Sequence, residues 1–310
     1  EANHFDCEFR TSLMKQTEGH PLFTAEVLRV LRAQGNLVRD PEGCWIAHAP
    51  VDWALLPPRA AALIDERILF LPQEARRLLD TASVEGDEFT AEVLAHVHSL
   101  PTHTVIDLLS RELASKHNLV LALEPIDDGG AILSRYRFRH HWVRQYLYAH
   151  LDAAERAQAH KTIGQALEMH SQQPGRRSAG APIQLAQHFE LAKEHSKAIS
   201  YWRLAGKQLA ERGMLSEAID SLTHALRLIP AEDLQKRFDL LFDREQLYDL
   251  TANRDGQTRD LAELQRLATV TGREDWRALV HLRRANLAET TAQYNIALTE
   301  ARAAATFAQS

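Results

Sequence analysis

The fold is decided by residues 134–148, which read SRYRFRHHWVRQYLY. In the first half, apolar and charged residues alternate, so that Tyr136 and Phe138 would face one way and the arginines the other. This two-residue period is typical of a half-buried strand. The second half carries four apolar residues at the spacing of one helix face: Trp142, Val143, Tyr146 and Leu147. The stretch therefore predicts a strand that runs directly into a helix, with His140 and His141 at the junction.

The residues before this stretch predict short helices and small β-hairpins. A helix over 5–13 precedes one over 22–34, which Pro21 opens at the position where its missing N–H costs least. An Asp-Pro-Glu-Gly turn predicts a hairpin over 37–46. Four helices and a second hairpin are predicted next, over 59–69, 73–84, 90–97, 102–116 and 119–139. The last three of these helices and the hairpin after them occur in the order of a winged-helix domain.

The residues after this stretch predict helices alone. A long helix over 153–170 leads into a polar linker over 172–182 that is rich in Gly and Pro. Seven helices are predicted beyond the linker, over 183–193, 196–211, 216–229, 231–252, 257–269, 274–291 and 294–308.

These seven helices show signs of an internal repeat. Arg244 and Arg284 occupy similar places about 40 residues apart, as do Asp260 and Glu300. A period of this length with two antiparallel helices in each repeat predicts an α-solenoid. The segment 216–230 is typical of the second helix of a tetratricopeptide-like repeat. The sequence therefore predicts a mainly α fold, in which a winged helix with small β-hairpins is followed by an α-solenoid of tetratricopeptide-like helical hairpins.

Composition places the chain among ordinary globular proteins. Its 310 residues are 45% hydrophobic and 25% charged, with a formal net charge of −6, so the overall charge does not favour nucleic acid or an anionic membrane. It has neither an apolar run long enough for a membrane span nor the pattern of a signal peptide. Two cysteines, Cys7 and Cys44, make no disulfide framework, so a cytoplasmic location is expected. We also expect the chain to be a fragment of a longer parent protein.

Four motifs occur in an order that resembles one protein family. They are the segment 17–23 entering a helix, the segment 45–67 with a Trp and a Leu-Pro pair, the segment 78–89, and the Phe-Arg-His of 138–140 followed by Tyr148. In this order they resemble the C-terminal half of a STAND-type signal-transduction ATPase, as found in bacterial ATPase-type transcriptional regulators and in cyclase or kinase fusions.

The resemblance implies a role for three residues in the full-length parent. Gly19 and Pro21 match the Gly-x-Pro of the family's lid, which lies beside the adenine. His140 matches the junction histidine that reaches the β-phosphate of bound ADP. It also implies ATP or ADP as the cofactor of the parent, and four domains: lid helices (1–36), a winged helix (37–152), a connecting helix with linker (153–182), and a solenoid, expected to be truncated (183–310).

The sequence gives no reason to expect catalysis by this fragment. A P-loop needs Gly-x4-Gly-Lys-Ser/Thr, and the single Gly-Lys pair, at Gly206 and Lys207, lacks both the first Gly and the Ser/Thr. No catalytic residue, cofactor or metal site is therefore predicted here. The three histidines that a metal site would have to use are not spaced to converge: His96, His98 and His103.

Three further patterns are explained by structure and not by a functional site. The arginines at 135, 137 and 139 would suit a DNA-reading wing, but the candidate recognition helix, 102–113, has two acidic residues and one Arg. Glu85, Asp87 and Glu88 are expected to form a solvated helix start. Tyr201, Trp202 and Trp276 are expected in the solenoid core.

The leading hypothesis is a regulatory, non-catalytic part of a STAND-type signalling or transcription regulator. In it, the winged helix would couple the nucleotide state to repeats that bind an inducer, a protein partner or another copy of the chain. One alternative is a tetratricopeptide-like interaction scaffold with a structural winged helix. A weaker one is a DNA-binding winged-helix transcription factor. No membrane partner is expected, and the signal, output domain and oligomeric state are not encoded in any pattern found.

Overall fold

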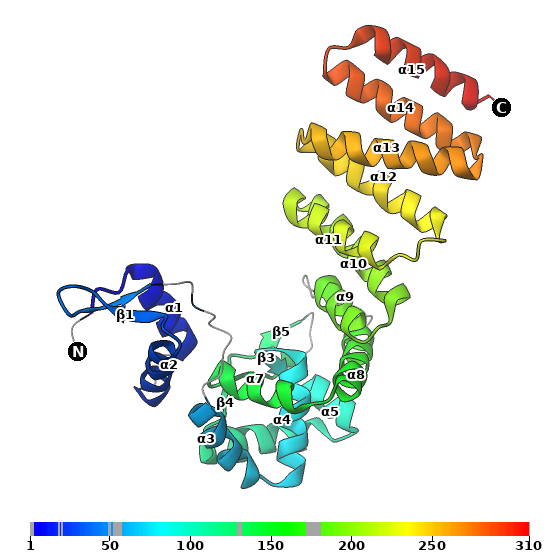
Figure 1. The fold of residues 1–310 in the computed structure, drawn as a ribbon. Coiled ribbons are helices and arrows are strands. Elements are labelled where there is room, and N and C mark those ends of the chain that lie inside the picture. The colour runs from blue at the N-terminus through cyan, green and yellow to red at the C-terminus, as the bar shows by residue number, and fades with distance from the viewer. Residues whose placement is uncertain are drawn as a thin grey trace. The chain divides into compact units, whose positions relative to one another are not determined.

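The chain folds as two compact units, Glu1–Ser178 and Ala179–Ser310 (Figure 1). The computed structural model describes residues 3–17, 19, 21–48, 51, 58–128, 132–171 and 181–309. Four predicted features lie at least partly outside these residues: His20 of the lid motif, the Leu-Pro pair at 56–57, the Gly-Gly tip of the second hairpin, and most of the linker. Among the described residues, no helix is both long and apolar enough to cross a bilayer.

The first unit opens with two helices and a small hairpin. These elements are α1 (Cys7–Thr17), α2 (Pro21–Ala33), β1 (Leu37–Arg39) and β2 (Trp45–Ala47). The strands pair antiparallel with Val38 opposite Ile46, which places the predicted turn between them. Helix α2 begins at Pro21, as its position before an amphipathic run predicted.

The rest of the first unit mixes short helices and strands. Its elements are α3 (Pro58–Leu69), α4 (Gln73–Glu85), β3 (Glu88–Thr90), α5 (Ala91–His98), α6 (Thr102–Asp107), the π-helix η1 (Leu108–Lys116), β4 (Val120–Ala122), β5 (Ile126–Asp127), β6 (Ile132–Leu133), β7 (Arg135–Phe138), α7 (His141–His150) and α8 (Ala153–Ser171).

A three-stranded antiparallel sheet, in the order β3-β7-β4, organises this region. Its central strand, β7, presents Tyr136 and Phe138 to the core, where both lie near the ring of Phe89 in β3. Two residues after the strand, α7 begins and buries Trp142, whose side chain is 1% exposed. The strand-to-helix junction predicted from residues 134–148 is therefore confirmed, and it joins the sheet to the helical part of one core.

The sequence missed or misplaced three features of this sheet. Strand β3 was not predicted, because three residues are too few to show a period. The second hairpin, predicted over 119–139, is split in two: β6 forms its own small hairpin with β5, and β7 pairs with β4. The expectation of a solvated helix start at Glu85–Glu88 is wrong, because Glu85 is buried at the end of α4 and Glu88 lies in β3.

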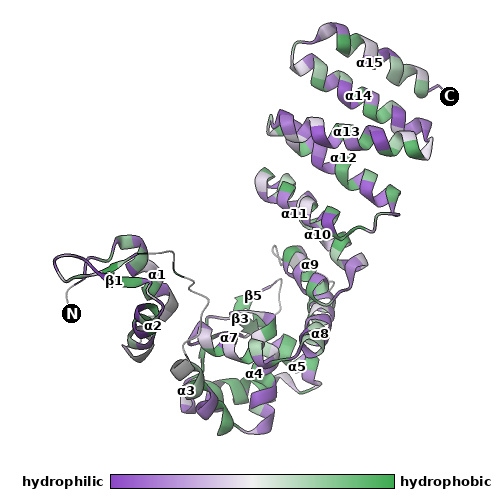
Figure 2. Ribbon diagram, in the orientation of Figure 1, coloured by the Kyte–Doolittle hydropathy of each residue, from purple (hydrophilic) through white to green (hydrophobic). Residues whose placement is uncertain are grey.

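The second unit consists of seven helices in the described residues, stacked in chain order (Figure 1). They are α9 (Ala181–Leu191), α10 (His195–Glu211), α11 (Leu215–Leu228), α12 (Leu234–Leu250), α13 (Arg254–Thr271), α14 (Glu274–Thr290) and α15 (Tyr294–Phe307). Each helix packs mainly on its neighbours in sequence. Hydrophilic and hydrophobic residues alternate along these helices, which is the pattern of amphipathic helices sharing a thin core (Figure 2).

Three of these hairpins repeat along the chain. The first helices begin at His195, Leu234 and Glu274, so the spacings are 39 and 40 residues, within the range predicted from the sequence. Four small residues, Ala198, Ala205, Ala218 and Ala225, are buried in these hairpins. Trp202 and Trp276 are buried as expected, whereas Tyr201 is only half-buried and stacks on Phe189. Trp276 stacks on Phe238 at 3.9 Å between ring centroids. The α-solenoid prediction is confirmed.

The turn inside each hairpin is the same. Its middle residue adopts a left-handed backbone: Gly213 at φ 78°, Ala252 at φ 52° and Ala292 at φ 59°. In each case the next amide donates back to the carbonyl five residues earlier, as in Met214 N–H to Leu209 O at 2.9 Å. Only one of the three turns uses the glycine that this geometry prefers.

Glu85 provides a pH test of the first unit. Its Oε1 accepts hydrogen bonds from the N–H and hydroxyl of Thr90 at 3.0 and 3.1 Å. Its pKa is raised from 4.5 to about 8, chiefly by burial and to a lesser extent by Glu92, while the bonds from Thr90 act to lower it. The folded chain therefore holds a proton that the unfolded chain releases, so the free energy of unfolding falls as pH rises from about 4.5 to about 8.

We predict that Glu85→Gln removes this pH dependence, because the amide keeps an oxygen for Thr90 and carries no charge. Between pH 5 and pH 8 the difference in stability between the variant and the original chain should grow by up to about 4 kcal/mol in the variant's favour. Urea unfolding at a series of pH values measures it. Glu74→Gln, at an exposed site on the same helix, should leave the profile unchanged. Parallel profiles for Glu85→Gln and the original chain would contradict the prediction.

Candidate functional site

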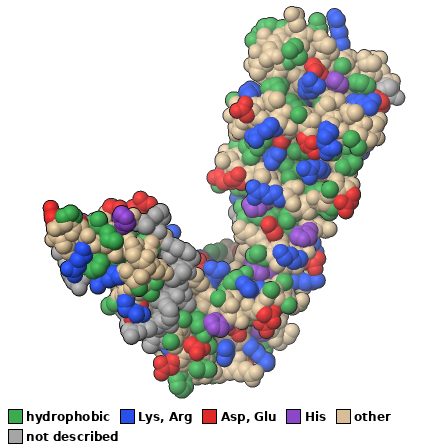
Figure 3. All heavy atoms as spheres, viewed as in Figure 1, with side chains coloured by type: hydrophobic (Ala, Val, Ile, Leu, Met, Phe, Trp, Pro, Cys, Tyr) green, Lys and Arg blue, Asp and Glu red, His purple; other side chains and the backbone are tan. Residues whose placement is uncertain are grey.

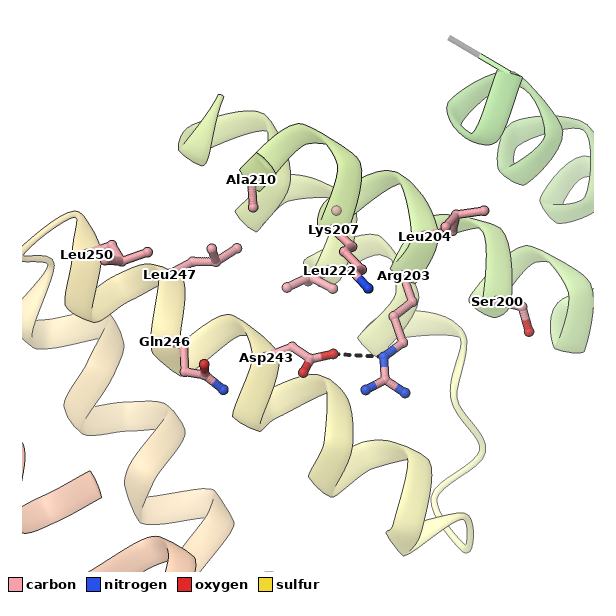
Figure 4. A pocket seen from close by; sticks show the side chains of 11 residues that line it. Ser200, Arg203, Leu204, Lys207, Ala210, Leu222, Asp243, Gln246, Leu247 and Leu250 are labelled. Atoms are coloured by element: carbon pink, nitrogen blue, oxygen red, sulfur yellow. Dashed lines mark hydrogen bonds and ion pairs between the residues drawn. The ribbon is translucent and has the colours of Figure 1, made fainter. Parts of the chain in front are cut away.

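The candidate site is a groove of about 600 Å³ in the second unit. We call it the α10–α12 groove, because its walls are one face of α10 and one face of α12, the first helices of adjacent repeats (Figure 4). Its lining residues are Ser200, Arg203, Leu204, Gly206, Lys207, Ala210, Leu222, Asp243, Gln246, Leu247 and Leu250.

The floor of the groove depends on a close helix contact. A Cβ on Gly206 would lie 3.0 Å from Cγ of Leu222, a tighter contact than Cβ atoms usually make, so α10 and α11 pack closely here and a larger residue would displace Leu222. In the sequence, Gly206 belongs to the Gly-Lys pair that lacks the other residues of a P-loop. In the structure, Gly206 allows α10 to pack closely on Leu222 of α11.

The rim of the groove combines apolar and charged side chains. Leu204 and Leu250 are 40% and 71% exposed. Nε of Arg203 donates to Oδ2 of Asp243 at 2.7 Å, so this ion pair connects the two walls (Figure 4). Lys207 points into the same space, and none of the ion pairs between described residues involves it. The groove is thus preformed, partly apolar and carries an excess of positive charge.

Behind the groove, a buried ionic network fixes α12. Glu245 is fully buried, and its carboxylate accepts from Arg283 of α14 at 2.6 and 3.1 Å and from Gln257 of α13 at 2.7 Å. Arg283 also donates to Asp249 at 3.0 Å. This network joins first helices of adjacent repeats and so sets the position of one groove wall.

A second set of ion pairs repeats with the solenoid. Arg244 binds Asp260 through two bonds, of 2.6 and 2.9 Å, and Arg284 binds Glu300 at 3.1 Å. The sequence showed that these residues recur about 40 positions apart, but not that each Arg is paired with the acidic residue 16 positions later. Positive and negative side chains are accordingly interspersed over the visible face of the second unit (Figure 3).

The three residues implied by the family resemblance lie on two elements. Gly19 has φ 72° in the turn before α2, and Pro21 is the first residue of that helix. His140 is the N-cap residue of α7, and its carbonyl accepts from Val143 N–H at 3.0 Å. Helix α2 packs mainly on α1, α3 and β1, and α7 on α3, α4 and β7. The structure therefore brings Gly19 and Pro21 together, and places His140 on an element that is not one of their main neighbours.

The junction histidines differ in their surroundings. His141 is half-buried, and burial lowers its pKa, which Asp87 opposes and Arg144 reinforces. Arg144 is held by Ser83 O at 3.0 Å and Asp87 at 3.2 Å. The first turn of α7 therefore carries His141, whose lowered pKa favours the neutral imidazole, and Arg144, whose guanidinium is held by Ser83 and Asp87.

The histidines considered for a metal do not form a cluster among the described residues. Nε2 of His98 lies 2.8 Å from Oγ1 of Thr81, and the ring of His96 contacts His170 edge-on. A group that the sequence did not suggest is formed instead by His4, Asp40 and Cys44, whose possible ligand atoms lie within 4.8 Å of one another. It arises from the pairing of residue 3 with the hairpin, which no local pattern reveals. Oδ1 of Asp40 also accepts hydrogen bonds from the backbone N–H groups of Glu42 and Cys44 in the turn.

The helix considered for DNA recognition has its cations neutralised. In α6 and η1, Arg111 lies 3.4 Å from Asp107, and Lys116 lies 3.0 Å from Glu112. On the sheet, Arg135 pairs with Glu88. Phosphate contacts by these three cations would have to break their pairs, so the candidate recognition helix does not favour a nucleic-acid interface.

The ionic network behind the groove can be tested by mutation. Glu245→Ala should lower the free energy of unfolding by about 3 kcal/mol, because it leaves Arg283 without its buried partner. Glu263→Ala on α13 is the comparison: its pairs with Arg266 and with Arg237 of α12 are only partly buried, and the change should cost no more than about 1 kcal/mol. Thermal and urea unfolding measure both variants. Equal losses for the two would show that the network does not hold α12 in place.

Comparison with known proteins gives one distant match. No family model and no curated protein matches the chain. Among solved structures, it is similar to the crystal structure of a Signal Transduction ATPase with Numerous Domains (STAND) protein with a tetratricopeptide repeat sensor from Pyrococcus horikoshii. The identity is 13% and the TM-score 0.35, over 97% of this chain and 51% of that one, so the chain spans about half that protein's length.

Proposed function

We propose that the second unit is a docking module that binds a protein partner in the α10–α12 groove. The observation that carries this proposal is the exposure of Leu204 and Leu250 on a preformed concave surface. Exposed apolar side chains gathered on one surface mark interaction sites more often than isolated ones do. Stacked helical repeats use such concave surfaces for binding.

We further propose that this module belongs to the regulatory, non-catalytic part of a STAND-type signalling protein, located in the cytoplasm. In the longer parent, the first unit would act as a winged helix between a nucleotide-binding core and the repeats. Gly19 and Pro21 would lie beside the adenine, and His140 would reach the β-phosphate of ADP. The N-cap position of His140 supports this role, because free amides at a helix start attract anions.

The alternative is an interaction scaffold in which the first unit is only structural. Both hypotheses require the groove, so they differ in the first unit alone. Loss of nucleotide from the parent after a change at His140 would separate them. DNA binding by the first unit is not proposed, since the cations of its candidate recognition helix are paired.

Docking in the groove can be tested by site-specific crosslinking. A photo-reactive residue at Gln246, on the groove wall, should crosslink one defined protein in cells of the source organism, and Leu250→Glu should abolish that product by placing a charge in the apolar end. The same photo-reactive residue at Arg227, exposed and outside the groove lining, is the control. Products that are equal at both positions, or that survive Leu250→Glu, would contradict docking in the groove.

The nucleotide role can be tested in the full-length parent. His140→Ala should loosen ADP retention, because the imidazole is proposed to hold the β-phosphate, and should raise basal signalling output. The nucleotide that co-purifies with the protein is measured by chromatography after denaturation. His103→Ala, at an exposed site in the same unit, should retain ADP. Unchanged ADP content and output in His140→Ala would reject the latch and leave the scaffold alternative.

A further inference from the structure

We infer that the α10–α12 groove recognises an acidic amphipathic helix, a partner segment that presents a leucine-sized side chain about one turn from a carboxylate. This inference rests on the proposed docking function and adds the chemistry of the partner. It follows from the apolar side chains gathered at one end of the groove and from the excess charge of its lining.

One end of the groove is apolar. Ala210, Leu247 and Leu250 face one another there, and Leu222 forms the adjoining floor (Figure 4). Leu250 leaves 71% of its surface exposed, so a partner side chain that covers it removes apolar surface from water at both sides of the contact. A groove of about 600 Å³ accepts a few side chains of leucine size and not a folded domain.

The other end of the groove is charged, and its charges do not cancel. Two cations, Arg203 and Lys207, and one carboxylate, Asp243, line it. Arg203 is bound to Asp243 across the groove. Lys207 is the cation left to meet an incoming group, and no ion pair of the described residues engages it. A carboxylate placed on Lys207 is complementary in charge, whereas a basic segment would face two cations.

The spacing of these groups fits a helix. Leu204, Lys207 and Ala210 follow one another on the same face of α10, each separated by three residues, or about 4.5 Å along the axis. Side chains three or four positions apart on a partner helix are separated by nearly the same rise. One turn of such a helix therefore spans the distance from the apolar end to Lys207.

The test uses the whole chain and a defined probe. The probe is a fluorescein-labelled alanine-based helical peptide of about four turns, with two leucines four positions apart and a glutamate one turn away. Two matched peptides replace the glutamate with glutamine or with lysine. Fluorescence anisotropy gives the dissociation constants for the original chain and for Lys207→Gln, Leu250→Ala and the control Arg227→Gln, which removes an exposed charge outside the groove lining.

We expect the glutamate peptide to bind about five-fold more tightly than the glutamine peptide, and the lysine peptide to bind weakest. Lys207→Gln should remove the preference for glutamate. Leu250→Ala should weaken both the glutamate and glutamine peptides about five-fold while leaving their ratio unchanged. Arg227→Gln should behave like the original chain. All three substituted positions are on the surface, and circular dichroism checks that each variant is folded.

Two outcomes would overturn the inference in distinguishable ways. If the three peptides bind equally and Leu250→Ala still weakens them, the groove docks partners but does not select acidic ones, so the proposed function survives without this chemistry. If no peptide binds, or if binding ignores both Lys207→Gln and Leu250→Ala, the inference fails, and a partner crosslinked at Gln246 would show that docking uses another chemistry.

Discussion

The buried carboxylate of Glu245, paired with Arg283, is the constraint on which the second unit depends. A charge removed from water must find its partner, and here the partner comes from the first helix of the next repeat. The pair therefore favours one relative position of α12 and α14 over many that apolar packing alone would tolerate. In a repeat protein each repeat contacts only the adjacent repeats, so contacts such as this pair determine the geometry of the whole unit.

The α10–α12 groove follows from this constraint. Its second wall is the face of α12 opposite to the network, which holds that wall in place before any partner arrives. The first wall is fixed by the close crossing at Gly206 and Leu222. Because the groove is already formed before binding, little conformational entropy is lost when a partner binds. This favours binding even at a shallow surface with few contacts. Arg203 and Asp243 add a polar link between the walls.

Sequence patterns predicted the architecture well wherever a period was long enough to read. Trp142 and its neighbours were assigned to the core from helical spacing, and the solenoid from a recurrence near 40 residues. Features that depend on distant segments could not be read. Glu85 looks like a surface acid until β3 and α5 cover it, and the alanine at 252 gives no sign of a left-handed turn. The groove was missed because Lys207 and Leu250 belong to different repeats, and no local pattern links them.

The central claim is that the first helices of adjacent repeats, and not their outer helices or the first unit, form the docking surface. Hydrogen–deuterium exchange of the whole chain, alone and with its captured partner, tests this most directly. Amides of α10 and α12 should gain protection on binding, while those of α11 and α13 exchange as before. Protection confined to α11 and α13, or to the first unit, would contradict the account.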